Sequence, residues 1–170
     1  MEKVLFSSNA IGSILVECYK NGRKLETGGI LIGPESHKNV ITDVVVSSIH
    51  ADRESSFYYQ NERDVKFLNK ELRKFQLKGY EHKGNFHSHP TGMFNLSQGD
   101  IDTSLNMLRS PSYKLNNNLI MCIVTESNQN VDMPIFSYIV SQDDNNDPVV
   151  KQVASKMLPR HCIIECLECI

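Results

Sequence analysis

The sequence contains no apolar stretch of the roughly 20 residues that a membrane-spanning helix needs. It also lacks an excess of charge of either sign, since 18 Lys and Arg residues accompany 20 Asp and Glu residues and the formal net charge is -2 at pH 7. A basic surface for nucleic acid and an acidic disordered tail are therefore both unexpected. We expect neither nucleic acid nor a membrane among the partners.

The N-terminal segment and the cysteines both predict a cytoplasmic protein. The segment MEKVLFSSNAIGSILVECYK carries Glu2 and Glu17 and lacks the uninterrupted apolar core and cleavage site of a secretory signal. Five cysteines are an odd and unevenly spaced set, which favours reduced thiols over a disulfide framework. A length of 170 residues with 40% hydrophobic residues suits one domain spanning residues 1–170.

Hydrophobic periodicity predicts an α/β (α+β) chain with helices beside a sheet. The expected helices cover residues 8–19, 62–77 and 100–108, and the expected strands cover residues 27–32, 39–49, 80–87, 119–125 and 135–140. The first two strands should pair through a turn at residues 33–38. Residues 50–61 and 141–148 should be loops, and the closing segment has no clear pattern.

Two histidines one residue apart, His87 and His89, stand at the end of the strand expected at residues 80–87. Residues i and i+2 of a strand point to the same face, so both imidazoles can reach one point. Pro90 ends the strand, and a short loop leads to a helix start that brings Asp100 as an oxygen ligand. Two nitrogens and one carboxylate leave one position of a tetrahedral zinc for water, which is typical of catalytic sites. Such water becomes a nucleophile near pH 7 but needs a neighbouring base.

This stretch resembles the JAMM motif of the JAB (MPN+) zinc metallopeptidases. H-S-H-P from His87 is followed by six residues and then S-x-x-D, with Ser97 and Asp100 at its ends. The run ETGGILIG, which begins at Glu26, is similar to the Gly-rich strand where this family has its catalytic glutamate. The likeness extends from Glu26 to about residue 140.

The resemblance implies a curved mixed β-sheet flanked by helices, the cytidine-deaminase-like MPN/JAB fold. It implies one zinc ion per chain on His87, His89 and Asp100, with Glu26 as the general base. It further implies that Ser97 donates a hydrogen bond to the oxyanion of the tetrahedral intermediate.

The same resemblance implies a function. JAMM enzymes remove ubiquitin-like modifiers from lysine side chains or process their C-termini, and this short chain is similar to stand-alone bacterial members. We expect a zinc-dependent isopeptidase or peptidase of a bacterial conjugation or antiphage defence system, with a ubiquitin-like or other conjugated protein's C-terminal tail as partner. A processing peptidase for a ThiS/MoaD-like sulfur carrier and a non-catalytic MPN scaffold are the alternatives.

Several site residues have a second interpretation. Ser97 and Asp100 also fit a plain helix capping box, and Glu35 competes with Glu26 but lies in a Pro-containing turn. Phe57, Tyr58 and Tyr59 fit either packing or a wall of the substrate groove, where related enzymes bind an extended tail as an added strand.

The remaining histidines and the C-terminal cysteines are expected to be structural. His37, His50 and His82 lack ligand-like spacing and should lie at the surface. The tail residues His161, Cys162, Cys166 and Cys169 could form a second zinc site. The helical spacing of the three cysteines favours one buried helix face instead.

Overall fold

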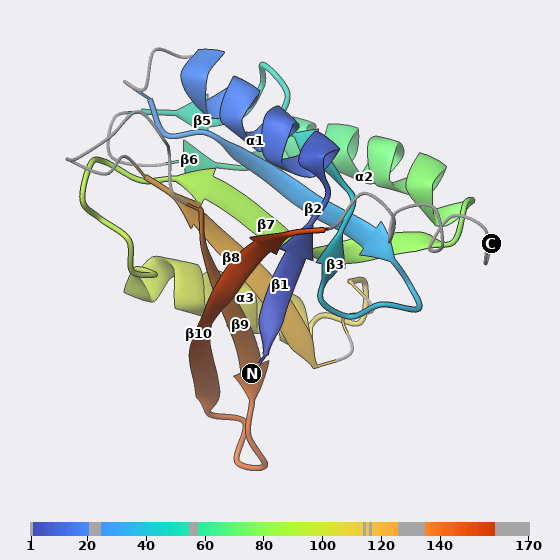
Figure 1. Ribbon diagram of the computed structural model, residues 1–170, viewed down its shortest axis with the longest axis vertical. Coiled ribbons are helices and arrows are strands. Elements are labelled where there is room, and N and C mark those ends of the chain that lie inside the picture. The colour runs from blue at the N-terminus through green and yellow to red at the C-terminus, as the bar shows by residue number, and fades with distance from the viewer. Residues whose placement is uncertain are drawn as a thin grey trace.

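The computed structural model describes residues 2–20, 25–54, 58–113, 115, 117–125 and 135–158. These residues form three helices: α1 (Ser8–Lys20), α2 (Glu62–Gln76) and α3 (Gln98–Arg109). They also form ten strands: β1 (Lys3–Phe6), β2 (Gly28–Pro34), β3 (Val40–Ile41), β4 (Asp43–Val46), β5 (Asp52–Arg53), β6 (Tyr58–Tyr59), β7 (Tyr80–Ser88), β8 (Asn118–Val124), β9 (Ile135–Gln142) and β10 (Pro148–Met157). Figure 1 shows their arrangement.

Eight of the strands form one mixed sheet in the order β3-β1-β10-β9-β8-β7-β2-β4. The pairs β1–β3, β1–β10 and β7–β8 are parallel and the other pairs are antiparallel. The sheet curves strongly, so that β1 and β10 cross in front of the central strands in Figure 1. Strands β5 and β6 form a separate two-stranded sheet. The predicted architecture, a curved mixed sheet flanked by helices, is confirmed.

Alternation along the central strands divides the core between the two faces of the sheet. Leu31 of β2 packs with Ile14 of α1, whereas its neighbour Ile32 packs with Leu68 of α2. Strand β8 alternates in the same way, and the face that it turns away from α1 packs against α3. Helix α1 therefore covers one face of the sheet, and α2 and α3 share the other.

A β-bulge at Gly84 changes which residues of β7 lie on the α2/α3 face. The register of β7 against β2 shifts between the pairs Leu31–Gly84 and Ile32–His82, which leaves Lys83 as the extra residue. Gly84 has φ +149°, and a Cβ there would overlap the carbonyl oxygen of Ile120. Because of the bulge, His82 lies on the same face as Asn85, and His82 Nε2 donates to Asn85 Oδ1 (3.0 Å).

Most predicted helices and strands are confirmed, with ends within two residues of the prediction. The exceptions are short strands and strands that pair with a segment far away in the sequence. The strand expected at residues 39–49 is divided into β3 and β4, and the loop expected at residues 50–61 contains β5 and β6. Strands β1 and β10 were not predicted. They pair with each other in parallel from opposite ends of the described chain, so no local turn signal accompanies them.

Two buried cysteines agree with the expectation of reduced thiols. Cys18 and Cys122 are free, and burial raises the pKa of each thiol to about 12. His161 and the cysteines Cys162, Cys166 and Cys169, for which a buried helix face was predicted over a second zinc site, lie outside the described residues. Within the described part of the chain, no helix combines the length and apolarity needed to span a bilayer.

The prediction that His82 lies at the surface is wrong. His82 is 6% exposed, while His37 and His50 are exposed as predicted. The bulge at Gly84 turns the imidazole into the space between α2 and the sheet, where it lines a small cavity with Leu68 and Asn85. Burial penalises the imidazolium and lowers the pKa of His82 below its ordinary value.

This burial predicts that His82 makes the fold sensitive to acid. Below the ordinary histidine pKa of about 6.5, His82 binds a proton in the unfolded chain but not in the folded chain, so the stability of the fold decreases as the pH falls. The slope from one such group approaches about 1.4 kcal/mol per pH unit. Urea unfolding should therefore show that the free energy of unfolding changes less with pH in His82→Gln than in the wild type. Between about pH 5.5 and 7.5 the two changes should differ by about 1 kcal/mol. His37→Gln is the exposed control, and equal slopes in all three proteins would contradict the assignment.

Candidate metal centre and cleft

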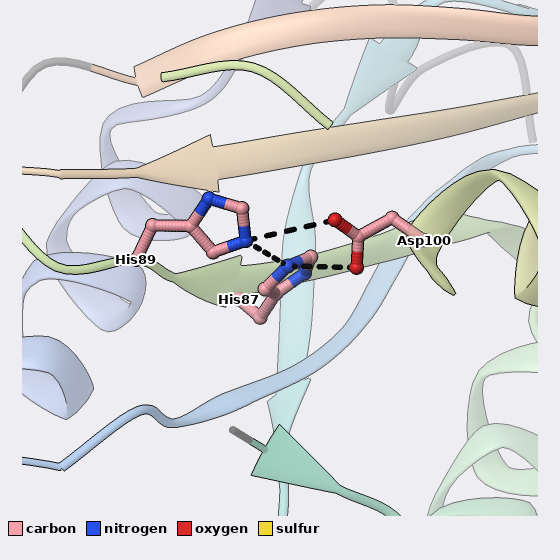
Figure 2. Close-up of side chains that lie close together, drawn as sticks. All are labelled: His87, His89 and Asp100. Carbon is pink, nitrogen blue, oxygen red and sulfur yellow. Dashed lines mark hydrogen bonds and ion pairs between the residues drawn. The ribbon is translucent and has the colours of Figure 1, made fainter. Parts of the chain in front are cut away.

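His87, His89 and Asp100 converge at the end of β7 (Figure 2). His87 Nε2 lies 2.8 Å from His89 Nε2 and 3.1 Å from Asp100 Oδ1, and His89 Nε2 lies 3.6 Å from Asp100 Oδ2. The ligand atoms of all three residues lie within 4.8 Å of one another. The group predicted from the sequence spacing is therefore assembled in the fold.

These separations fit a tetrahedral metal ion. Zinc bonds of about 2.0–2.2 Å to nitrogen and oxygen place neighbouring ligands about 3.3 Å apart, close to the three contacts observed here. His89 Nδ1 also donates to the carbonyl oxygen of Met93 (3.1 Å). This bond fixes the tautomer whose Nε2 is unprotonated and directed at the centre, as is usual for a metal-binding histidine. The three residues can hold a metal ion.

Asp100 reaches the centre from the first turn of α3. Ser97 caps this helix: its N–H and its hydroxyl both donate to Asp100 Oδ2 (2.7 Å each), and its Oγ accepts from the N–H of Asp100 (3.2 Å). Burial opposes ionisation of Asp100, but its contacts with the imidazoles of His87 and His89 and its hydrogen bonds from Ser97 outweigh burial and hold the pKa of the carboxyl well below its usual range. Asp100 is thus an anionic ligand at neutral pH.

The capping interpretation of Ser97 is confirmed by this geometry. A hydroxyl carries a single hydrogen, and that of Ser97 is donated to Asp100. Donation to an oxyanion would require the hydroxyl to rotate away from Asp100, so this second role stays a prediction.

Glu26 lies beside the centre, where the chain enters β2. It is 9% exposed, and its N–H donates to the carbonyl oxygen of Glu54 (2.7 Å). Burial raises the pKa of Glu26, and the charges of His89 and His87 act against this rise while that of Asp100 adds to it. The carboxyl of Glu26 therefore senses all three residues of the centre. Its competitor Glu35 is exposed in the turn after β2.

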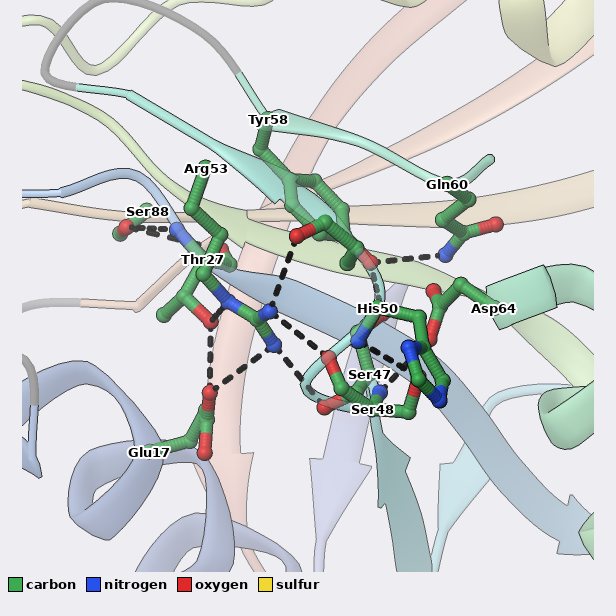
Figure 3. A network of polar contacts seen from close by, with 11 residues as sticks. Glu17, Thr27, Ser47, Ser48, His50, Arg53, Tyr58, Gln60, Asp64 and Ser88 are labelled. Atoms are coloured by element: carbon green, nitrogen blue, oxygen red, sulfur yellow. Dashed lines mark hydrogen bonds and ion pairs between the residues drawn. The ribbon is translucent and has the colours of Figure 1, made fainter. Parts of the chain in front are cut away.

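A buried polar network holds the segment around Glu26 in place (Figure 3). Arg53 of β5 donates from Nε to Thr27 Oγ1 (3.0 Å) and pairs with Glu17 of α1 (3.5 Å), and Thr27 Oγ1 donates to Glu17 Oε1 (2.6 Å). Thr27 in turn exchanges hydrogen bonds with Ser88, through Thr27 N to Ser88 Oγ (2.9 Å) and Ser88 N to Thr27 O (2.8 Å). The start of β2 is thereby fixed against the end of β7, between His87 and His89.

The sequence did not indicate this network. Arg53 lies in a polar segment without periodicity, and it contacts Ser47 and Ser48 through their backbone carbonyls, which no side-chain pattern can show. The network becomes evident only in the folded structure, where the buried side chains of Arg53 and Glu17 lie next to each other.

Removing one partner of this network should destabilise the fold strongly. The side chains of Arg53 and Glu17 are 13% and 7% exposed, so Arg53→Met leaves a carboxylate and three backbone carbonyls poorly paired. We expect a loss of about 2–4 kcal/mol in the free energy of unfolding. Lys66→Met, which breaks the exposed pair of Lys66 with Glu62 on α2, should cost about 0.5 kcal/mol or less. Urea unfolding compares the two, and equal losses would contradict the role of Arg53.

A cleft with a volume of about 240 Å³ adjoins the centre on the α2/α3 face of the sheet, and His87 and Asp100 contribute to its lining. Tyr58 and Tyr59 line it as well, and their role as a wall of a substrate groove stays a prediction. Tyr58 is packed firmly: its hydroxyl contacts Ser47 Oγ and accepts from Gln60 Nε2 (3.0 Å), and burial raises its pKa to about 12. Tyr59 is 62% exposed. Phe57, the third aromatic residue of the prediction, lies outside the described residues.

Comparisons with known proteins identify the family. A family model described as prokaryotic homologs of the JAB domain matches residues 11–147, which include Glu26 and the three residues of the centre. The solution structure of a protein from Desulfitobacterium hafniense is similar with a TM-score of 0.59 at 17% identity, covering 93% of this chain and 96% of that one, which shows a shared fold. A comparison with curated proteins gives no match. The chain therefore belongs to the prokaryotic homologs of the JAB domain.

Proposed function

We propose that the protein is a zinc-dependent peptidase or isopeptidase that cleaves the amide bond at the C-terminal tail of a ubiquitin-like modifier or another conjugated protein. The observation that carries this proposal is the position of Glu26 beside His87, His89 and Asp100, at the end of a cleft. A scaffold that only binds a partner has no need for a metal-binding group with a buried carboxyl next to it.

The residues divide the chemistry among themselves. His87, His89 and Asp100 hold the zinc ion, which when bound supplies Lewis acidity and makes water nucleophilic near neutral pH. Glu26 takes the proton of the attacking water and delivers it to the leaving amine. The raised pKa of Glu26 suits this role, because a carboxylate of higher pKa accepts a proton more readily, and a pKa nearer the working pH makes both protonation states accessible. Ser97 keeps Asp100 in position.

The small β5–β6 sheet offers a place for the tail. Within the described residues it has two strands, so each has one edge without a strand partner. An extended peptide can add to such an edge, and Tyr58 and Tyr59 of β6 lie in the wall of the cleft that leads to His87. This arrangement supports an extended tail as the substrate. A bacterial conjugation or antiphage system is the setting that we propose for the reaction.

The test uses zinc-loaded protein and fusions of ubiquitin-like proteins to a reporter, joined either linearly or through a lysine side chain. We expect cleavage at the end of the ubiquitin-like tail. Cleavage of linear sulfur-carrier extensions alone would favour the processing peptidase. The proposal would be contradicted if the protein purified without zinc, could not be loaded with zinc and cleaved no fusion. The non-catalytic scaffold would then be the remaining interpretation.

A further inference from the structure

Asn85 occupies a place in the cleft that the proposed catalysis does not use. It lies two residues before His87 on the same face of β7, and the bulge at Gly84 adds His82 to this line. Asn85 lines the cleft together with His87. Three polar side chains, His82, Asn85 and His87, thus run along one strand from the interior to the metal centre.

The amide of Asn85 has a donor to spare. Its Oδ1 accepts from His82 Nε2 (3.0 Å), which fixes the orientation of the amide. Its Nδ2 contacts the sulfur of Met107 (3.4 Å), and a thioether is a weak acceptor. An amide nitrogen carries two hydrogens, so among the described contacts of Asn85 neither has a strong partner. A ligand oxygen in the cleft would be a better acceptor than the sulfur.

The walls of the cleft are suited to an aromatic ring. Val65 of α2, Met107 of α3 and Met121 of β8 supply apolar surface, and methionine sulfur makes favourable contacts with aromatic rings. Among the described lining residues, Asp100 is the one Asp, Glu, Lys or Arg. In the proposed centre its carboxylate is engaged by the metal ion, so a charged side chain in the cleft would be buried without a free counter-charge. A cavity of about 150 Å³ holds benzene in another protein, and this cleft offers about 240 Å³.

We propose that the cleft is a specificity pocket for a tyrosine side chain next to the scissile bond, with Asn85 as the specificity-determining residue. Asn85 Nδ2 donates to the phenolic oxygen, and Met107 and Met121 contact the ring. The location beside the scissile bond rests on the proposed function, whereas the affinity for a phenol does not.

Binding is measured without catalysis, by NMR of zinc-loaded Glu26→Gln protein with ¹³C-labelled methionine methyls. The probes are the N-acetyl amides of tyrosine, phenylalanine, lysine and glycine. The tyrosine probe should shift the methyl signals of Met107 and Met121. It should leave the signal of Met157, which is exposed on β10, unchanged. It should bind about 5- to 10-fold more tightly than phenylalanine, as one added hydrogen bond implies. Asn85→Leu should abolish this ratio. Equal binding of lysine, or no shift of Met107 and Met121, would overturn the proposal.

Cleavage separates this proposal from the proposed function. Fusions that carry tyrosine, phenylalanine, lysine or glycine beside the scissile bond should be cleaved fastest with tyrosine, and Asn85→Leu should remove its advantage over phenylalanine. Cleavage without such a preference would overturn the pocket and leave the peptidase. Tyrosine-selective binding without cleavage of any fusion would overturn the peptidase and leave the pocket.

A second variant covers the case in which Asn85→Leu does not fold. Thr103 is exposed on α3 and lines the same cleft. Thr103→Phe should narrow the cleft and weaken tyrosine binding about 10-fold or more, with unchanged zinc content. Undiminished tyrosine binding in this variant would place the phenol elsewhere and overturn the proposal.

Discussion

Asp100→Ala is expected to lower the affinity of the protein for zinc by more than about 100-fold. Loss of a residue that merely orients a ligand already costs about 10- to 100-fold, and Asp100 supplies the anionic ligand atom of the centre. The substitution leaves two imidazoles, which rarely suffice to hold zinc against a chelator. Competition with a chromophoric chelator, together with zinc content after dialysis, measures the change.

Asp102→Ala is the matched control for this experiment. Asp102 lies on the same helix, is exposed, and accepts a hydrogen bond from Gln98 Nε2 (2.9 Å). Its removal should leave zinc binding unchanged. If Asp100→Ala retained one zinc per chain with wild-type affinity, the ion would bind elsewhere and the candidate centre would be wrong.

Glu26→Gln is expected to lower kcat by about 10²- to 10⁴-fold while zinc content stays unchanged. The amide has nearly the same shape as the carboxyl and keeps the fold, but it cannot accept the proton of the attacking water. Steady-state cleavage of a ubiquitin-like fusion measures kcat, and the zinc content of the same sample shows that the centre is intact.

Glu35→Gln separates this effect from a general loss of negative charge near β2. Glu35 is exposed in the turn at the far end of that strand. We expect wild-type kcat for this variant. Full activity of Glu26→Gln, or an equal loss in Glu35→Gln, would show that another group is the base.

The candidate metal centre was predictable from sequence because its residues are close together in the chain. The spacing of His87 and His89 on one strand, and the helix start that brings in Asp100, are local features that survive folding unchanged. Glu26 is more distant, and the likeness of its Gly-rich strand to a known family was needed to select it. The pairing of β2 with β7 explains why it lies beside the centre.

The features that the sequence did not reveal depend on contacts between distant segments. The parallel pairing of β1 with β10 joins strands that no turn connects, and the exposed residues of β10 blur its alternation. The bulge at Gly84 places His82, which was predicted to lie at the surface, on the covered α2/α3 face of the sheet, and a single glycine in a strand does not identify a register shift. Arg53 acquires its partners only when β5 folds back onto the start of β2.

The two oxygens of Asp100 serve two structures at once. Oδ1 faces His87 at 3.1 Å, while Oδ2 accepts the Ser97 bonds that begin α3. Occupancy of the centre and formation of the first turn of α3 are therefore thermodynamically linked equilibria, since both draw on one carboxylate. An ion that binds only the folded chain adds about 2.7 kcal/mol to its stability at a concentration 100 times the Kd. If a metal ion binds at this centre, the free energy needed to open this helix would increase with the free metal concentration.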